Sequence, residues 1–171
     1  MALSMYELTV PTLLRGFGVL SSYLEKAEDF ARTKALDPGE LIQARLAPDM
    51  LTFAGQIQSA SDKARRGAAR LGAIEAPSMP DTETTIAELD ARIAKTVAFL
   101  RAIDPKRFDG SDARTVDLKT RMFGGTYRGD EYLLQFLLPD FFFHVATAHA
   151  ILRHRGLPIG KADYLGQRAG R

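Results

Sequence analysis

The sequence has 171 residues, 46% of them hydrophobic and 26% charged. These values indicate one folded domain with a buried core and exclude fibrous or disordered classes. The chain contains no cysteine, so disulfides, thiolate zinc sites, iron–sulfur clusters and cysteine nucleophiles are excluded. The 23 Lys and Arg residues against 21 Asp and Glu residues leave a net charge of +2, which is too small for a dedicated nucleic-acid-binding protein.

The sequence predicts no membrane association. Residues 1–15 lack the basic start and the continuous apolar stretch of a signal peptide. Residues 132–152 are long enough to cross a bilayer, but they contain Pro139 and His144, and Asp140 near their middle would cost about 2.5–3.5 kcal/mol. We therefore expect a cytoplasmic protein in which this segment is the most buried helix.

Apolar residues spaced three and four apart predict two long helices in the first half of the chain. The first ends near Phe30 and begins only around residues 9–12, because Pro11 is tolerated in a first turn. A turn at 37–39 and a short helix over 40–46 follow. The second long helix is predicted over 48–72, with Pro48 at its start.

Two more long helices are predicted in the second half. One follows the N-cap pair Asp81-Thr82 and continues to about residue 100, and the other covers about 130–155, where Pro139 kinks or divides it. Between them, alternation over 114–127 predicts a small β-hairpin, with its turn near Lys119 or at Gly124-Gly125.

These elements predict an all-α fold: an antiparallel four-helix bundle with a small β-hairpin before the last long helix. A single domain covers residues 1–171. Its C-terminal tail, about 157–171, is expected to pack only in part.

The three histidines are the first candidates for a functional site. His144, His149 and His154 are five residues apart, so each step turns about 140° around a helix and the three cannot bind one ion. His144 falls on the apolar face, with Asp140 one turn before it, whereas the other two fall at the edge or outside. We therefore expect His144 to face the bundle interior near Asp140 or a polar residue of the second long helix.

A buried carboxylate beside a buried imidazole is costly unless they bond each other, a metal ion or another polar group. On the second long helix, Asp49 and Gln56 flank the apolar stripe and are candidates for a third ligand or a hydrogen-bond partner. Asp62 is a further acidic residue, expected to point outward. Two interpretations stay open: a core histidine satisfied by a nearby acid, or a metal or substrate site.

The chain resembles a known superfamily in three features. They are the order of the helices, the inward polar pair followed by Leu152-Arg153 and Gly156, and the run from Ala47-Pro-Asp-Met50 through Gln56 to Asp62. These are similar to the DinB/YfiT-like superfamily of metal-dependent enzymes. The blocks LPDFFFH (138–144), ILRHRG (151–156) and GKADYLG (160–166) resemble more closely a bacterial branch known only as a domain of unknown function.

The resemblance implies an altered metal site. Members of the superfamily bind a divalent ion with one histidine on the second helix and a His-x-x-x-His pair on the fourth. Matching on the downstream Leu-Arg and Gly puts the second of that pair at His144, the first at Asp140 and the remaining ligand around Gln56. Such mixed N/O ligation suits zinc, nickel, iron or manganese, and Asp49 and Asp62 are the further candidates for ligand binding.

Two functions are consistent with these observations. The first is a bundle that binds a small ligand beside a degenerate metal site between the second and fourth helices. The alternative is a divalent-metal-dependent transferase or hydrolase that uses a small thiol or water as nucleophile. A homodimer is expected, because Phe142 and Phe143 point away from the His144 face and need a cover. The basic residues Lys63, Arg65, Arg66 and Arg70 are predicted to form a solvated face rather than a nucleic-acid interface.

Overall fold

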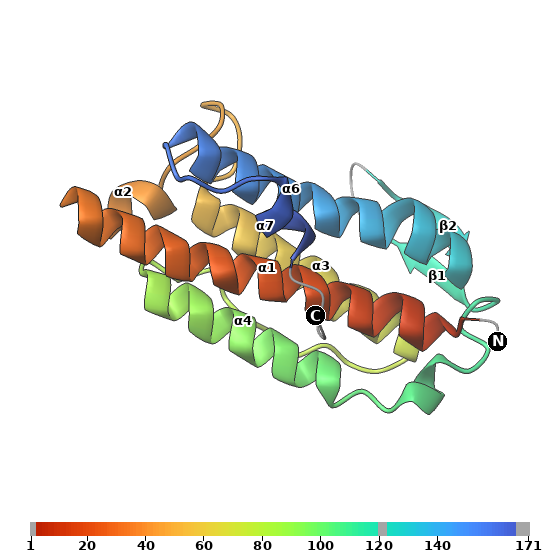
Figure 1. The fold of residues 1–171 in the computed structure, drawn as a ribbon. Coiled ribbons are helices and arrows are strands. Elements are labelled where there is room, and N and C mark those ends of the chain that lie inside the picture. Colours follow the sequence, from red (N-terminus) through yellow and green to blue (C-terminus); the bar gives the residue numbers. More distant parts are fainter. Residues whose placement is uncertain (1–2, 120–122, 167–171) are drawn as a thin grey trace.

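The computed structural model describes residues 3–119 and 123–166, and it is a helical bundle with a two-stranded hairpin (Figure 1). The four long helices are α1 (Met5–Lys34), α3 (Phe53–Gly72), α4 (Ile86–Arg101) and α6 (Leu138–His154). The shorter elements are α2 (Pro38–Ile42), η1 (Pro105–Phe108), β1 (Thr115–Leu118), β2 (Gly125–Arg128), α5 (Gly129–Glu131), η2 (Tyr132–Leu137) and α7 (Lys161–Leu165). The predicted all-α bundle, with a small hairpin before the last long helix, is therefore confirmed.

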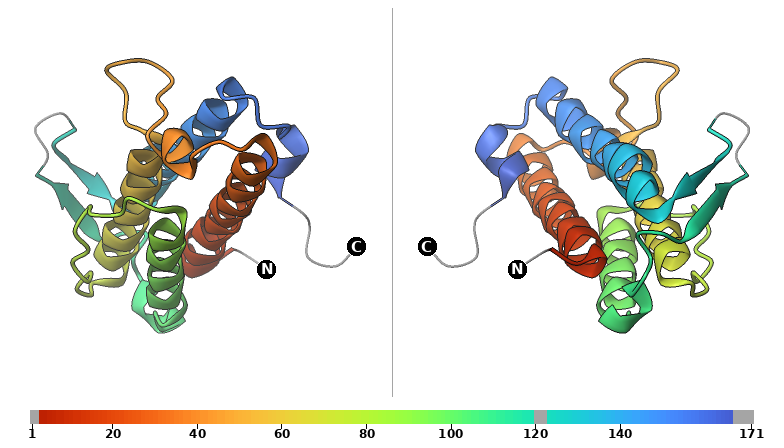
Figure 2. Two further views of the ribbon diagram at one scale, coloured as in Figure 1. Left: turned by 90° about the vertical axis from the view of Figure 1, so that its left-hand side faces the viewer. Right: turned by 90° about the vertical axis from the view of Figure 1, so that its right-hand side faces the viewer.

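Neighbouring helices in this bundle are antiparallel in some pairs and parallel in others. The order around the bundle is α1, α4, α3, α6 (Figure 2). Gln58 and Ser61 of α3 contact Arg92 and Thr96 of α4, so α3 and α4 run in the same direction. This is possible because segment 73–85 returns along the whole of α3 before α4 begins (Figure 1).

Side-chain caps set the starts of the helices, and they move several predicted boundaries. Thr85 and Glu88 form the capping box that starts α4 at Ile86, so the helix does not follow directly on Asp81-Thr82 as predicted. Ser4 and Glu7 form a capping box that starts α1 well before residues 9–12. Pro11 lies inside that helix, where it lacks an N–H to donate and its ring crowds the carbonyl of Glu7, four residues earlier. The second long helix starts at Phe53 instead of 48, because the Thr52 hydroxyl accepts from the backbone N–H of Gly55.

The last long helix is divided at its proline, as predicted, and the division includes a wider turn. Residues Tyr132–Leu137 are π-helical, and α6 continues from Leu138 with Pro139 in its first turn. The hairpin before it pairs Thr115 with Arg128, and part of its predicted turn lies outside the described residues. Among the helices described, none has both the length and the apolar character needed to cross a membrane.

The bundle core depends on a close approach between α1 and α6. A Cβ atom on Gly16 would lie 2.3 Å from the Phe141 ring. Phe141 is fully buried and packs against Phe17 at a ring-centroid distance of 5.3 Å. Two turns of α6 further along, Tyr23 of α1 meets His149, so the same two helices stay in contact over this length.

Replacing Gly16 with alanine is expected to destabilise the bundle, because the rigid Phe141 ring has no room to move. The matched control is Gly18→Ala on the same helix, where an added Cβ meets nothing within 4 Å. Gly18→Ala should raise the free energy of unfolding by about 0.5–1 kcal/mol. The free energy of unfolding of Gly16→Ala should be about 1–3 kcal/mol lower than that of the Gly18→Ala control. Urea unfolding of the two variants measures the difference, and equal stabilities would contradict the close approach.

Candidate functional site

The interface between α3 and α6 brings His144 and Gln56 together in the core. The Nδ1 atom of His144 lies 2.8 Å from Oε1 of Gln56, and the two residues are 7% and 1% exposed. The Gln56 amide nitrogen donates to the Leu51 carbonyl over 3.3 Å. Its oxygen therefore faces the ring, and Nδ1 of His144 is the donor in this pair.

The other edge of the imidazole faces a carboxylate and an ammonium group. His144 Nε2 lies 3.5 Å from Oδ1 of Asp140, one helical turn earlier on α6. The second Asp140 oxygen, Oδ2, is 2.8 Å from Nζ of Lys63 on α3. His144 is thus buried within reach of Asp140 and a polar residue of α3, as predicted.

The three residues expected to bind a metal are close together, but they do not converge on one point. Gln56 bonds Nδ1 and Asp140 faces Nε2, so they lie on opposite edges of the same ring. An ion bound at Nε2 would have Asp140 as a neighbour and Gln56 only as the group that orients the ring. In the described part of the chain, no three His, Cys, Asp or Glu side chains gather closely enough to hold a metal. The residues present therefore do not fit a three-ligand divalent site.

The ionic state of Asp140 follows from its surroundings. Burial raises the pKa of this carboxyl, but the contacts with His144 and Lys63 outweigh burial and hold the pKa below its ordinary value of 3.8. Asp140 therefore carries a negative charge at neutral pH, and the Lys63 ammonium neutralises it.

The two other acidic candidates lie elsewhere. Asp49 is exposed on the irregular segment before α3. Asp62 does not point outward as expected: it forms ion pairs with Arg66 at 3.1 Å, with Arg92 at 2.9 Å and with Arg65. Arg65 is itself only 1% exposed, so it does not belong to a solvated basic face. Its burial is the reason that Asp62 is drawn inward.

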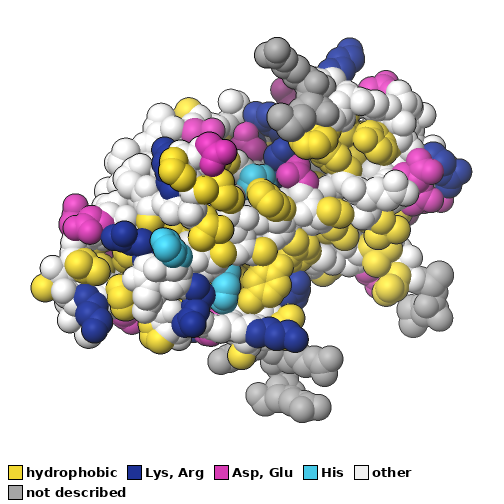
Figure 3. All heavy atoms as spheres, turned by 90° about the horizontal axis from the view of Figure 1, so that it is seen from above, with side chains coloured by type: hydrophobic (Ala, Val, Ile, Leu, Met, Phe, Trp, Pro, Cys, Tyr) yellow, Lys and Arg dark blue, Asp and Glu magenta, His cyan; other side chains and the backbone are white. Residues whose placement is uncertain are grey.

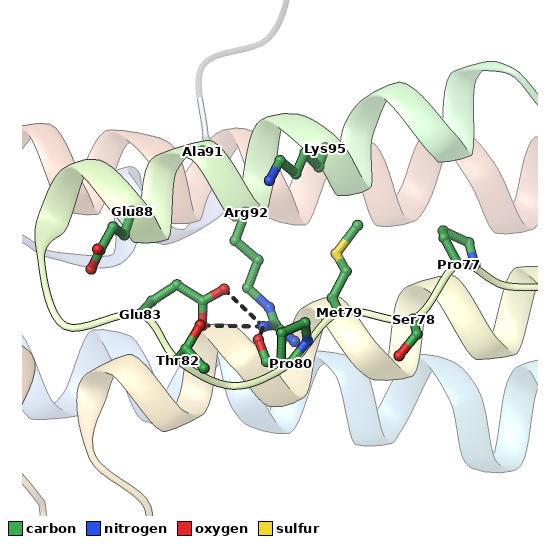
Figure 4. A pocket seen from close by; sticks show the side chains of 10 residues that line it. All are labelled: Pro77, Ser78, Met79, Pro80, Thr82, Glu83, Glu88, Ala91, Arg92 and Lys95. Atoms are coloured by element: carbon green, nitrogen blue, oxygen red, sulfur yellow. Dashed lines mark hydrogen bonds and ion pairs between the residues drawn. The ribbon is translucent and has the colours of Figure 1, made fainter.

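Arg92 is a buried residue that the sequence reading missed. It extends from α4 toward the returning segment and pairs with Glu83 at 2.9 Å (Figure 4). It also pairs with Asp81 at 2.8 Å and donates to the Pro80 carbonyl at 3.0 Å. The position was detectable, since Arg92 falls between Leu89 and Ile93 of the apolar stripe. A cavity of about 470 Å³ lies beside it, but the Arg92 guanidinium is already occupied by these internal partners.

A second cavity, of about 180 Å³, extends from Asp140 along α3; we call it the α3–η2 groove. Its α3 side carries Lys63, Arg66 and Arg70. Its opposite side carries Tyr132 and the apolar residues Phe136 and Leu137 of η2, with Leu118 from the end of β1. Asp62, Asp81 and Asp140 supply its acidic groups. The Arg70 guanidinium donates to the Tyr132 hydroxyl over 3.2 Å.

The remaining histidines take no part in this site, which confirms the argument from helical rotation. His149 Nδ1 lies 2.7 Å from the hydroxyl of Tyr23 on α1, and His154 is exposed at the end of α6. Burial raises the pKa of Tyr23 and lowers that of His149, so this pair is neutral at physiological pH.

Comparison with known proteins agrees with this fold. The chain matches the family described as Domain of unknown function (DUF1993) over residues 5–165. The chain belongs to the DUF1993 family. Among solved structures it is similar to a DinB family member from Shewanella denitrificans, at 36% sequence identity and a TM-score of 0.90, over 95% of this chain and 92% of the other. A search among curated proteins found no match.

The pH dependence of stability in this DUF1993 protein tests the Asp140 ion pair. Because the folded pKa of Asp140 is lowered, the pair contributes stability above about pH 4 and loses it as the pH falls through the folded pKa. Asp140→Asn should cost about 1.5–3 kcal/mol at pH 7, and its difference from wild type should shrink toward pH 3. Chemical unfolding at several pH values measures both.

The control is Asp130→Asn, which removes a carboxylate from the surface ion pair with Arg128. Its effect should be smaller, because an exposed pair is screened by water. A difference between wild type and Asp140→Asn that stays constant from pH 7 to pH 3 would contradict a titrating ion pair at Asp140.

Proposed function

We propose that this DUF1993 protein binds a small organic ligand in the α3–η2 groove and that the ammonium group of Lys63 takes the place of a divalent ion. The observation that carries this proposal is the 2.8 Å contact between Lys63 Nζ and Asp140 Oδ2. A lysine at this distance neutralises the one carboxylate beside His144, and a metal ion would have to displace it.

The hydrogen bond between Gln56 and His144 supports the same function. It ties up one ring nitrogen of His144, which leaves Nε2 as the ring's remaining polar atom, facing Asp140. Asp140, held between this ring and Lys63, then forms a rigid polar end of a groove whose η2 side is apolar, an arrangement typical of small-molecule sites.

The alternative is a divalent-metal-dependent transferase or hydrolase that uses a thiol or water as nucleophile. It would need zinc, nickel, iron or manganese to bind at Nε2 of His144 and at Asp140 with the lysine moved aside. One nitrogen and one carboxylate are two protein ligands, fewer than the three of typical catalytic zinc sites. The proposed function does not need this rearrangement.

Metal titration by calorimetry decides between the two functions. Wild type should give null isotherms with zinc, nickel and manganese. Lys63→Met should bind zinc weakly, since it frees the Asp140 carboxylate, and adding His144→Ala to that variant should abolish the gain. His144→Ala alone should cost about 1–3 kcal/mol of stability, because polar partners lose their hydrogen bond. Stoichiometric metal in wild type that His144→Ala removes would establish the metalloenzyme instead.

We also propose that the protein is a homodimer and that it is cytoplasmic, as expected from the sequence. The dimer proposal rests on Phe143 of α6, which is 57% exposed and whose ring lies 5.5 Å from that of His144. Phe142, by contrast, is covered within the chain by the guanidinium of Arg15. Hydrophobic side chains gather on the face where α6 lies (Figure 3), and a second subunit would cover them.

Sedimentation velocity tests the dimer. Wild type should sediment as a dimer at micromolar concentrations, and Phe143→Ser should shift it to monomer because the apolar contact is lost. Leu165→Ser is the matched control, since Leu165 is similarly exposed, at 54%, but lies on α7. A monomeric wild type, or dissociation by both variants alike, would contradict an interface at Phe143.

A further inference from the structure

The charges around the α3–η2 groove do not balance among themselves. Lys63 is held by Asp140 and Arg66 by Asp62. Asp62 also serves the buried Arg65 and Arg92, and Arg92 draws in Asp81 and Glu83 as well. These contacts pair four cations with four carboxylates. Arg70 is a fifth cation at the groove, and among the described residues no carboxylate forms an ion pair with it.

The far end of the groove is therefore rich in hydrogen-bond donors. Arg70 donates one N–H to the Tyr132 hydroxyl, so the other N–H groups of its guanidinium can donate to a ligand. Burial raises the pKa of Tyr132, so its phenol keeps its proton. Because the phenol oxygen accepts from Arg70, its own O–H is directed elsewhere and can serve a bound group. Two donors side by side, with no carboxylate bonded to either among the described residues, suit an anion.

The walls next to these donors are aromatic. Tyr132 and Phe136 stack with ring centroids 5.8 Å apart and an interplanar angle of 20°. Tyr127 of β2 lies against both rings, at 6.5 and 6.2 Å. An aromatic lining beside a guanidinium fork favours a ligand that has a flat apolar body and an acidic group at one end.

The backbone gives a second, independent indication that this end of the groove is functional. Tyr132, Phe136 and Leu137, which line it, all belong to the π-helical turn η2. Such turns are rare and occur frequently at functional sites. This turn lies at the groove itself, between the short α5 and α6, and it brings the stacked rings to face α3.

We infer that the ligand is a small aromatic carboxylic acid, whose carboxylate is bound by Arg70 and Tyr132 and whose ring lies against Phe136. The volume of about 180 Å³ agrees with this size, since a cavity of about 150 Å³ holds a benzene ring. The inference rests on the proposed function, because it names the chemical class of ligand for the same groove. The acid end lies at Arg70 and the apolar end extends toward Leu118.

The test is a titration of the isotopically labelled full chain with sodium benzoate, followed by amide chemical shifts. Benzamide, which has the same shape but no charge, and inorganic phosphate, which has the charge but no ring, are the comparison probes. Benzoate should give saturable shifts around the groove, with a dissociation constant at least about tenfold lower than that of either comparison probe, as for a charge-assisted hydrogen bond.

Variants then locate the carboxylate. Arg70→Gln should weaken benzoate binding about tenfold or more, and Arg70→Lys should restore only part of it, because the fork geometry is lost. Arg101→Gln is the matched control, an exposed arginine in the last turn of α4, and should leave binding unchanged. A folded Arg70→Gln that binds benzoate as wild type does would overturn the inference.

The probes also separate this inference from the function on which it rests. If benzamide binds in the groove as tightly as benzoate, the carboxylate does not contribute to binding. The inferred acidic ligand is then wrong, but the proposal that the groove binds a small ligand still holds. If phosphate binds as tightly as benzoate, the ring does not contribute to binding, and the inferred aromatic part of the ligand is wrong. If benzoate causes no chemical-shift change at millimolar concentrations, the whole inference is wrong. Metal binding lost on His144→Ala, measured separately, would overturn the proposed function instead.

Discussion

Two guanidinium groups withdrawn from water are the constraint around which this bundle is arranged. Arg65 and Arg92 are 1% and 2% exposed, and an unpaired charge at such a position would be strongly destabilising. Their partners come from α3 itself and from the segment that returns beside it: Asp62, Asp81, Glu83 and the carbonyls of Pro77 and Pro80. That segment must therefore lie along the bundle, and this position allows α4 to run parallel to α3.

The same constraint decides the electrostatic character of the groove. Asp62 and Asp81 line it, yet their charge is already used to neutralise buried arginines. The charge at the groove that has no partner among the described residues is the positive charge of Arg70, although the chain as a whole is nearly neutral. The Asp140–Lys63 pair makes the opposite end neutral, so the groove has a polar but balanced end and a cationic end.

Much of this could be predicted from the sequence, and the gaps have physical causes. Helical periodicity identified the four long helices and placed His144 and Asp140 on the inner face, because burial follows the apolar stripe. It could not reveal that α3 and α4 are parallel, since a stripe defines a face and carries no direction. Arg65 and Asp62 were assigned to the surface because a charged side chain is normally solvated. Only the tertiary pairing among Arg65, Asp62 and Arg92 reverses that rule.

The candidate metal ligands show the same division. The resemblance to the superfamily selected Gln56, Asp140 and His144 together, and the structure brings them into contact. The edge of the imidazole on which each partner lies could not be predicted, because it depends on the side-chain rotamers. The sequence alone assigns Lys63 to a solvated basic face of its helix. Only the packing of α6 against α3 shows that Lys63 lies opposite Asp140 and neutralises it.

The π-helical turn at Tyr132–Leu137 has a consequence for how such a chain tolerates change in length. A wide turn takes up one more residue than an α-helical turn, and each residue of a helix adds about 100° of rotation. Because the extra residue is absorbed within the turn, deleting a single residue there would restore a regular helix and leave the helix after it facing α3. Asp140 and His144 would then keep their side of the bundle. The same deletion in the regular helix between them has no wide turn to absorb it and would rotate His144 by about 100° away from Asp140, so the π-helical segment is where the chain tolerates a change in length.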